Sequence, residues 1–497
     1  MHLNNPKISQ NAGSLPAKDL EIDVNAIFLV PKEGADLRKL PYGEVLRQRM
    51  RRARYELGDA DPFVTELPNQ TGTRLVLVGI DAAKSGFELL SRARAAIAAA
   101  RRHPTPRLLI ACFGLEDRLA ARACEAAVAA ALAADMQMPS YKSKPDKTTR
   151  LREIRIYGHR QPDGYARTRA AARGNNLARY LTALPPNELT PGSYRRRVEK
   201  LARGYRWKRE FLDMRKLKAS GAGAFLAVVR GSAEPDAGIL HLRYTPAGKS
   251  RKPGLALVGK GVCFDTGGTN LKTARHMHGM HEDMEGSAVA LGTLLALTEL
   301  KVDFPVDCWL ALAQNQIGPR AYKQNEVVRA ANGKTIEVVH TDAEGRMILA
   351  DTLYLASRAK PKIIVDYATL TGACVGALST RMSGAFTNRP GWIPVLIEAG
   401  EESGERVWPF PLPEDYEKPL KSDIADIKQC TLDSEADHIL AGVFLKKFLD
   451  GDPAWVHVDL AAGNHKGGLA HIPTDITGFG VRFTLSLLLD QKIFGSS

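Results

Sequence analysis

Short apolar runs that end at glycine or polar residues recur along the chain and predict buried strands. Two such runs, residues 73–79 and 107–113, lie in the first part of the sequence. The Ala-rich stretches 91–102 and 116–135 that follow them predict helices. Residues 139–147 are too charged to bury and predict a linker or surface turn. We therefore expect a small α/β domain at the start of the chain.

A longer series of the same kind follows a predicted helix at 174–184, which stops at two prolines. Predicted strands lie at 255–259, 306–313, 335–340, 363–367 and 455–460, and predicted helices at 286–300 and 347–358. Alternation of apolar strands with helices is typical of a largely parallel sheet covered on both faces. The expected fold is α/β, with a small N-terminal α/β domain and basic linker over residues 1–165. A larger α/β domain with a mostly parallel central sheet covered by helices is expected over 166–497.

Composition is that of a globular protein. A chain of 497 residues exceeds the size of a single core, and 44% hydrophobic with 25% charged residues is ordinary for a globular protein. No stretch approaches the roughly 20 uninterrupted apolar residues of a membrane span. The 6 cysteines are scattered without a CxxC pair, which favours reduced thiols and a cytoplasmic location.

The formal charge of +14 includes basic clusters at residues 47–54, 142–160 and 194–197. One interpretation is an electropositive surface for nucleic acid or acidic partners. The other is a set of solvated helix faces in an Arg-rich composition, which we favour because no helix-turn-helix or aromatic RNA-binding motif accompanies the charge.

Polar residues are dense in two segments that each follow a predicted strand. The first covers residues 258–272 and continues to 281–286, and the second covers 338–346. Ligands of open α/β sheets bind at the carboxyl ends of the strands, so both segments can reach one crevice.

Four carboxylates in these segments predict a metal site: Asp265, Asp283, Asp342 and Glu344. Together in one cleft they would have to protonate or bind cations. Two divalent ions about 3.5–4 Å apart form a common hydrolytic clamp. In extended backbone Asp342 and Glu344 would point to one face, so that one could bridge both ions. Oxygen-rich ligation suits Mn or Mg, and Zn also accepts carboxylates.

Three basic residues accompany these acids. Lys260 could lose its proton and act as a neutral ligand, whereas Lys272 could stay charged and polarise a reacting carbonyl. Arg346 cannot deprotonate, and its forked donors fit a planar anion. The alternative interpretation is that these acids and bases are ordinary turn residues that form surface ion pairs. A phosphate loop would need GxxxxGK[ST] and a serine hydrolase GxSxG, and neither motif is present.

At these segments the sequence resembles the leucine aminopeptidase family of di-metal enzymes. The family pattern VGKGxxFDxGGxxxK, DMxG and NTDAEGR is met by residues 258–272, 283–286 and 341–346. Agreement continues at 176–187, 368–373 and 404–408, and the similarity covers about residues 170–485.

The resemblance implies a metal-dependent exopeptidase that removes N-terminal amino acids from small peptides, with leucine and other apolar residues preferred. A hydroxide bridging two metal ions, Mn²⁺ or Zn²⁺, would attack the peptide carbonyl. A homohexamer is also implied. The alternative hypothesis is a basic hexameric nucleic-acid-binding protein with secondary peptidase activity.

The resemblance also implies a role for each site residue. One metal would be held by Lys260, Asp265, Asp283 and Glu344, and the other by Asp265, Asp342 and Glu344. Lys272 would stabilise the developing oxyanion, and Arg346 would hold a bicarbonate ion that shuttles the proton. Met280, Thr369 and Gly372 match positions that line the pocket for the first side chain.

Four histidines depart from or crowd this pattern. His340 replaces the asparagine before TDAEGR, and His276, His278 and His281 precede Asp283. They leave the metal preference and the shape of the substrate entrance open, and we interpret them as surface or supporting residues because their spacing matches no ligand motif.

Overall fold

The computed structural model describes residues 4–22, 24–144, 149–248, 252–433, 435–491 and 493–495. The chain divides into two compact units. The first contains residues 1–172, 401–404 and 466–475, and the second contains 173–400, 405–465 and 476–497. The short segments 401–404 and 466–475 thus group with the N-terminal unit. The expected contiguous division at 165/166 does not assign them to it. Among the described residues, no helix combines the length and apolar character needed to cross a membrane.

The first unit is built on a six-stranded sheet of order β1-β6-β5-β2-β4-β3. Its strands are β1 (Lys7–Asn11), β6 (Glu153–Tyr157), β5 (Arg107–Cys112), β2 (Asn25–Pro31), β4 (Arg74–Ile80) and β3 (Phe63–Glu66). Every neighbouring pair is parallel except β3 with β4. The strands predicted at 73–79 and 107–113 are confirmed as β4 and β5.

Helices α1 (Gly43–Ala53), α2 (Gly86–Ala100) and α3 (Asp117–Ala134) belong to the same unit, with α2 and α3 packed together. Helix α2 begins five residues before the predicted start because Ser85 and Glu88 form a capping box. Residues 139–144 of the predicted linker carry no helix or strand, and 145–147 lie outside the described residues.

The second unit is built on an eight-stranded sheet of order β15-β14-β17-β13-β9-β10-β8-β7. Its strands are β15 (Val407–Pro409), β14 (Ser383–Thr387), β17 (Ala454–Asp459), β13 (Ile363–Ala368), β9 (Leu255–Asp265), β10 (Val306–Asn315), β8 (Gly238–Tyr244) and β7 (Lys208–Asp213). The four central strands β17, β13, β9 and β10 are parallel, and antiparallel pairs flank them. The edge strands β14 and β15 are also parallel to each other, and the predicted α/β class with a mostly parallel sheet is confirmed.

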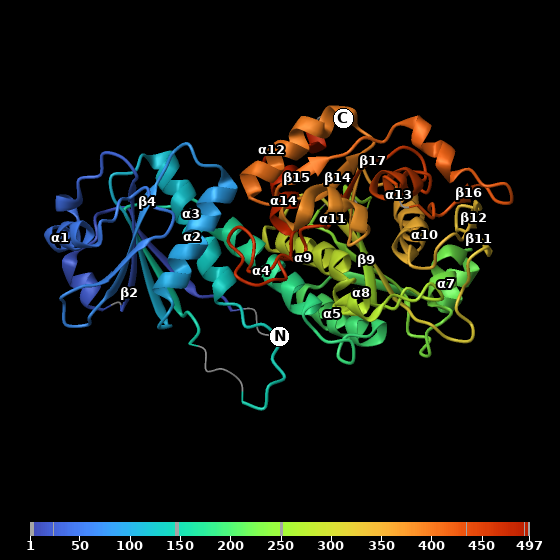
Figure 1. Ribbon diagram of the computed structural model, residues 1–497, viewed down its shortest axis with the longest axis horizontal. Helices are drawn as coiled ribbons and strands as arrows, with labels where there is room; N and C mark the ends of the chain where they lie inside the picture. Colours follow the sequence, from blue (N-terminus) through green and yellow to red (C-terminus); the bar gives the residue numbers. More distant parts are fainter. Residues whose placement is uncertain are drawn as a thin grey trace. The chain divides into compact units, whose positions relative to one another are not determined.

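Helices α9 (Glu285–Glu299) and α10 (Glu344–Arg358) cover opposite faces of this sheet (Figure 1). A Cβ on Gly259 of β9 would lie 2.4 Å from the Cα of Ser287 in α9. The next residue, Lys260, faces α10, since a Cβ on Gly345 would lie 2.7 Å from its Cε. Successive strand residues point to opposite faces, so the two helices lie on opposite sides.

Nine further α-helices lie in the part of the chain that the structure describes. They are α4 (Ala166–Thr182), α5 (Pro191–Tyr205), α6 (Met214–Ala219), α7 (Gly223–Val229), α8 (Ala274–Met277), α11 (Gly372–Leu378), α12 (Ile393–Ser403), α13 (Asp437–Lys446) and α14 (Val481–Leu489). The predicted helix 174–184 is confirmed as part of α4, and those at 286–300 and 347–358 as α9 and α10.

One predicted strand is only partly right. Residues 335–340 shorten to β12 (Thr335–Glu337), which belongs to a separate three-stranded sheet with β11 (Val327–Arg329) and β16 (Ile427–Lys428). Beyond Glu337 the main-chain N–H groups of Val339 and His340 donate to the side chain of Gln429, both at 3.2 Å. These hydrogen bonds replace the main-chain hydrogen bonds of a strand, and the chain then continues to α10.

Candidate active site

A cavity of about 820 Å³ lies in the second unit, at the carboxyl ends of β9, β13 and β17. All of the site residues predicted from the sequence except Arg346 line it. They are Lys260, Asp265, Lys272, Met280, Asp283, Asp342, Glu344, Thr369 and Gly372. The location agrees with the rule that ligands of open α/β sheets bind where parallel strands end.

Asp265 is the last residue of β9, and the turn that follows holds its side chain. Its Oδ1 accepts hydrogen bonds from the main-chain N–H of Gly267 and from the side-chain amide of Asn315, both at 2.8 Å. Gly267 has φ +87°, and a Cβ there would lie 2.4 Å from the carbonyl oxygen of Asn270. The turn therefore requires glycine at this position.

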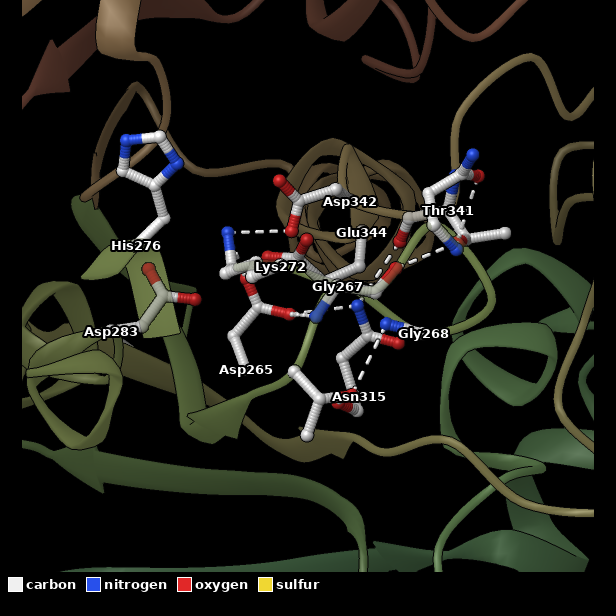
Figure 2. A network of polar contacts seen from close by, with 12 residues as sticks. Asp265, Gly267, Gly268, Lys272, His276, Asp283, Asn315, Thr341, Asp342 and Glu344 are labelled. Atoms are coloured by element: carbon white, nitrogen blue, oxygen red, sulfur yellow. Dashed lines mark hydrogen bonds and ion pairs between the residues drawn. The ribbon is translucent and has the colours of Figure 1, made fainter. Parts of the chain in front are cut away.

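The second polar segment is tied to the same turn through Thr341. Its hydroxyl donates to the carbonyl of Gly267 at 2.6 Å and accepts from the main-chain N–H of Asn270 at 2.8 Å (Figure 2). The extended backbone expected for Asp342 and Glu344 is wrong. Glu344 is the first residue of α10, and Ala343 before it has φ −104° and ψ 38°. The start of helix α10, and not the alternation of side chains along a strand, brings the carboxylates of Asp342 and Glu344 together.

Three carboxylates form the tightest group. Oxygen atoms of Asp265, Asp342 and Glu344 lie within 4.8 Å of one another. Figure 2 shows Lys272 directed into this group, with its Nζ 2.9 Å from Oδ2 of Asp265 and 2.5 Å from Oδ1 of Asp342. Lys272 thus contacts two of the predicted ligands.

Lys260 links the fourth carboxylate to this group. Its Nζ lies 2.7 Å from Oδ1 of Asp283 and 2.9 Å from Oε1 of Glu344, and it donates to the carbonyl of Thr369 at 2.8 Å. The hydroxyl of Thr369 also donates to Oδ1 of Asp283, at 2.7 Å. Thr369 therefore holds both a predicted ligand and the lysine beside it.

Burial and crowding perturb the acids and bases of the site. Burial raises the pKa of Asp342 to about 7, and the carboxylates of Asp265 and Glu344 add to the effect. Burial likewise raises the pKa of Asp283. For Lys260 burial acts to lower the pKa, but the surrounding carboxylates outweigh it and the pKa is raised. The pKa of Lys272 is raised in the same way.

The donor set fits divalent cations. Four carboxylates face two ammonium groups, which leaves an excess of negative charge in a buried site. Oδ2 of Asp283 and Oε2 of Glu344 are buried and have no hydrogen-bond partner among the described residues. Buried oxygens of this kind normally have a partner, and a cation would provide one.

Arg346 does not fit its predicted role. Its guanidinium is 2% exposed, and Nη2 donates to both carboxylate oxygens of Asp437, at 2.8 and 2.7 Å. Nη1 donates to the main-chain carbonyl of Gln429 at 3.2 Å. A bicarbonate ion would meet an arginine whose charge Asp437 already neutralises, so the predicted bicarbonate does not fit the residues present.

Two of the four histidines, His276 and His340, line the cavity, but among the described residues the group of ligand atoms within 4.8 Å contains only carboxylates. His276 and His278 are exposed, and His281 is half-buried. Nδ1 of His340 accepts a hydrogen bond from the main-chain N–H of Asp342 at 3.3 Å, and burial and Lys272 lower the pKa of His340. His340 thus supports the segment that carries Asp342.

Three residues of the site were missed by the sequence analysis. Asn315 holds Asp265, and Glu285 and Asp459 are buried carboxylic acids that line the cavity. Asn315 pairs in register with Asp265 at the carboxyl end of the neighbouring strand β10. The strand-end rule applied to that strand would have found it.

Comparison with known proteins agrees with this geometry. Residues 176–485 match the model of the cytosol aminopeptidase family, catalytic domain. A probable cytosol aminopeptidase of Synechococcus sp. is 38% identical over 428 residues, which cover 84% of this chain and 86% of that protein. One of Roseiflexus castenholzii is 40% identical over 332 residues, covering 66% and 67%.

Two solved structures share the fold. A mutant of tomato leucine aminopeptidase superposes with a TM-score of 0.85 at 28% identity, covering 99% of this chain and 98% of that one. The bottromycin maturation enzyme BotP in complex with Mn superposes with a TM-score of 0.81 at 30% identity, covering 94% and 99%. Both similarities extend over nearly the whole chain.

Proposed function

The chain belongs to the cytosol aminopeptidase family, and from this premise we propose that its acidic cavity binds two divalent metal ions and releases the first residue of peptides. The protein is a metal-dependent leucyl aminopeptidase, a hydrolase that acts on peptides. The two-ion mechanism and the preference for apolar first residues are our proposal. The observation that carries it is the gathering of Asp265, Asp342 and Glu344 within 4.8 Å.

We propose the ligand set that the family resemblance implies, and each of its residues lines the cavity. Lys260, Asp265, Asp283 and Glu344 would hold one ion, and Asp265, Asp342 and Glu344 the other. Bound divalent ions supply Lewis acidity and activate water as a nucleophile at neutral pH. Lys260 has to lose its proton to act as a ligand, so ion binding would release a proton from it. Mn²⁺ and Zn²⁺ are the proposed ions, and a similar structure is described in complex with Mn.

Lys272 is placed to stabilise the charge that develops on the substrate. It lines the cavity between Asp265 and Asp342, and its ammonium is 14% exposed. A fixed cation in a site shielded from water stabilises an oxyanion more than the neutral carbonyl that precedes it. We therefore assign Lys272 to the transition state of peptide hydrolysis.

The pocket for the first side chain would be formed by Met280, Thr369 and Gly372. A Cβ on Gly372 would meet no atom within 4 Å, so space is open at that position. Val375 and Leu370 line the same cavity and add apolar surface. A free α-amine would add a ligand to one of the bound ions, as the family resemblance implies, and this would restrict cleavage to the N-terminal residue.

A reporter assay tests this proposal. Leucyl p-nitroanilide should be hydrolysed, its N-acetylated form should not, and a chelator should abolish the reaction until Mn²⁺ or Zn²⁺ is added back. A panel of first residues should rank leucine and methionine above aspartate. Equal hydrolysis of the N-acetylated reporter would contradict the assignment of an exopeptidase.

Other expectations stay predictions. The homohexamer is tested by the mass of the assembly in solution. The nucleic-acid alternative gains no support, since the family and the relatives are named as aminopeptidases. We propose no second function.

A further inference from the structure

Arg346 and Asp437 form a buried ion pair next to the acidic cluster. Arg346 stands two residues after Glu344 in the first turn of α10, and its side chain is 2% exposed. A guanidinium that is almost fully buried needs an anionic partner, because an unpaired charge at such a depth is strongly destabilising.

Asp437 supplies that partner from another element. It is the first residue of α13, where the helix dipole favours an anion, and its side chain is 19% exposed. Helices α10 and α13 pack together, and the neighbouring Ile439 and Leu440 of α13 are buried in the core. The carboxylate is therefore fixed on the arginine by packing as well as by charge.

This pair changes what Arg346 can bind. Both oxygens of Asp437 lie within hydrogen-bond distance of Nη2, and the carbonyl of Gln429 takes Nη1. Nε has no hydrogen-bond partner among the described residues. A dissolved anion that approached Nε would gain little net attraction from a neutralised arginine, and it would be repelled by the Asp437 carboxylate.

We propose that Asp437 is a built-in anion that occupies the place of a dissolved bicarbonate at Arg346. The enzyme then works at full rate without bicarbonate. Asp437 acts through Arg346 and is a positioning residue: it holds the guanidinium in one orientation at the start of α10, the helix turn that carries Glu344. The inference deepens the proposed function, on which it depends only for the activity readout.

Removing the Asp437 carboxylate should allow an anion from solution to bind Arg346 instead. In carbonate-free buffer the kcat/KM of Asp437→Ala should fall at least about tenfold, because a buried charge has lost its partner. Added bicarbonate should restore most of that loss, formate should restore part of it, and chloride none. Asp437→Glu should keep its rate without any addition, and the wild-type rate should not respond to bicarbonate.

Asp307→Ala is the matched control. Asp307 is fully buried and accepts from Arg243 at 2.6 Å, far along β10 from the cavity. This variant should lose thermal stability without any response to bicarbonate. A bicarbonate response of equal size in the control would show a general effect of salt on stability and overturn the inference.

Direct binding separates this inference from the proposed function. Titration with ¹³C-bicarbonate, followed by NMR line broadening, should detect binding to Asp437→Ala and none to the wild type. Binding should disappear in Asp437→Ala combined with Arg346→Gln. Equal binding to the wild type and Asp437→Ala, or none to a folded Asp437→Ala, would overturn the inference even if no variant hydrolysed peptides.

Discussion

The two sheets of this protein place charged residues at the same topological position with different results. In the first sheet Lys32 follows β2 and Asp81 follows the neighbouring strand β4, and they form one ion pair at 3.3 Å. Their side chains are 40% and 26% exposed. At the corresponding end of β9 in the second sheet, Asp265 pairs with Lys272 at 2.9 Å, and their side chains are 3% and 14% exposed.

An excess of buried charge distinguishes the strand ends of the second sheet from those of the first. The pair in the first sheet is balanced and solvated, so each charge is satisfied where it stands. The second sheet brings together four carboxylates, three of them buried, and two lysines, and two carboxylate oxygens lack a hydrogen-bond partner among the described residues. An excess of buried charge of one sign is stable only with additional cations or protons.

Removal of an acid that would hold both ions should have the largest effect. Glu344→Ala should lower kcat/KM on a leucyl reporter by at least about 10³-fold, because both proposed ions lose a ligand and the nucleophile is no longer activated. Far-UV circular dichroism should stay that of the wild type. Asp342→Ala, which removes a ligand of one ion, should also lose most of the activity, and near-normal activity in either folded variant would refute the proposed site.

Replacing Lys272, the cation that pairs with Asp265, should have a smaller effect on activity. Lys272→Ala should lower kcat by about 10²-fold with little change in KM, because the lysine is assigned to the transition state and not to substrate binding. Steady-state kinetics on a series of leucyl peptides measures the two constants. A rise in KM at unchanged kcat would instead make Lys272 a substrate-binding residue.

Asp351 is a buried acid that does not line the cavity, so its removal should change the stability of the protein and not its activity. Asp351 in α10 accepts main-chain N–H groups of Phe225 and Ala331 at 2.8 and 2.7 Å, and burial raises its pKa to about 7. The folded state therefore holds this proton more tightly than the unfolded state does. Its contribution to stability is fully present below the unfolded pKa of about 4, and it is lost as pH rises through about 7.

Asp351→Asn should remove this dependence. The stability advantage of the wild type over the variant should shrink between pH 4 and 7 by on the order of 1 kcal/mol per pH unit. Denaturant unfolding at several pH values measures it, with kcat/KM expected to stay near the wild-type value. A difference that is constant across this range would show that Asp351 does not hold its proton in the folded state.

The smallest effect is expected at the edge of the first sheet. Asp81→Ala removes a solvated ion pair and should leave both kcat/KM and the thermal unfolding midpoint unchanged, because exposed pairs contribute little. Differential scanning calorimetry and the leucyl reporter check the two quantities. A large loss of activity would mean that the two edges are functionally alike.

Much of the architecture could be predicted from apolar patterning. The runs 107–113 and 363–367 correspond closely to β5 and β13, because buried parallel strands are almost uniformly apolar. Patterning failed where polar residues continue a strand. Lys260 and Asp265 lie inside β9, whereas an apolar criterion ends that strand at Gly259.

The contents of the site were predictable in part. A motif of lysines and acids indicated the chemistry of the site, and six of these residues line one cavity. Long-range partners carry no local signal, so the pairing of Arg346 with Asp437 across 91 positions could not be foreseen. Asn315 was within reach, because it lies only two residues beyond the strand predicted at 306–313.

The most direct test of the account is the number of metal ions bound by the protein and its variants, measured by native mass spectrometry after loading with Mn²⁺. The wild type should bind two ions per chain, Asp283→Ala should keep one, and Asp265→Ala, which removes a ligand of both, should bind neither tightly. A wild-type protein that binds no ion, or an Asp265→Ala variant that retains both, would contradict the claim that this acidic edge is a two-metal centre.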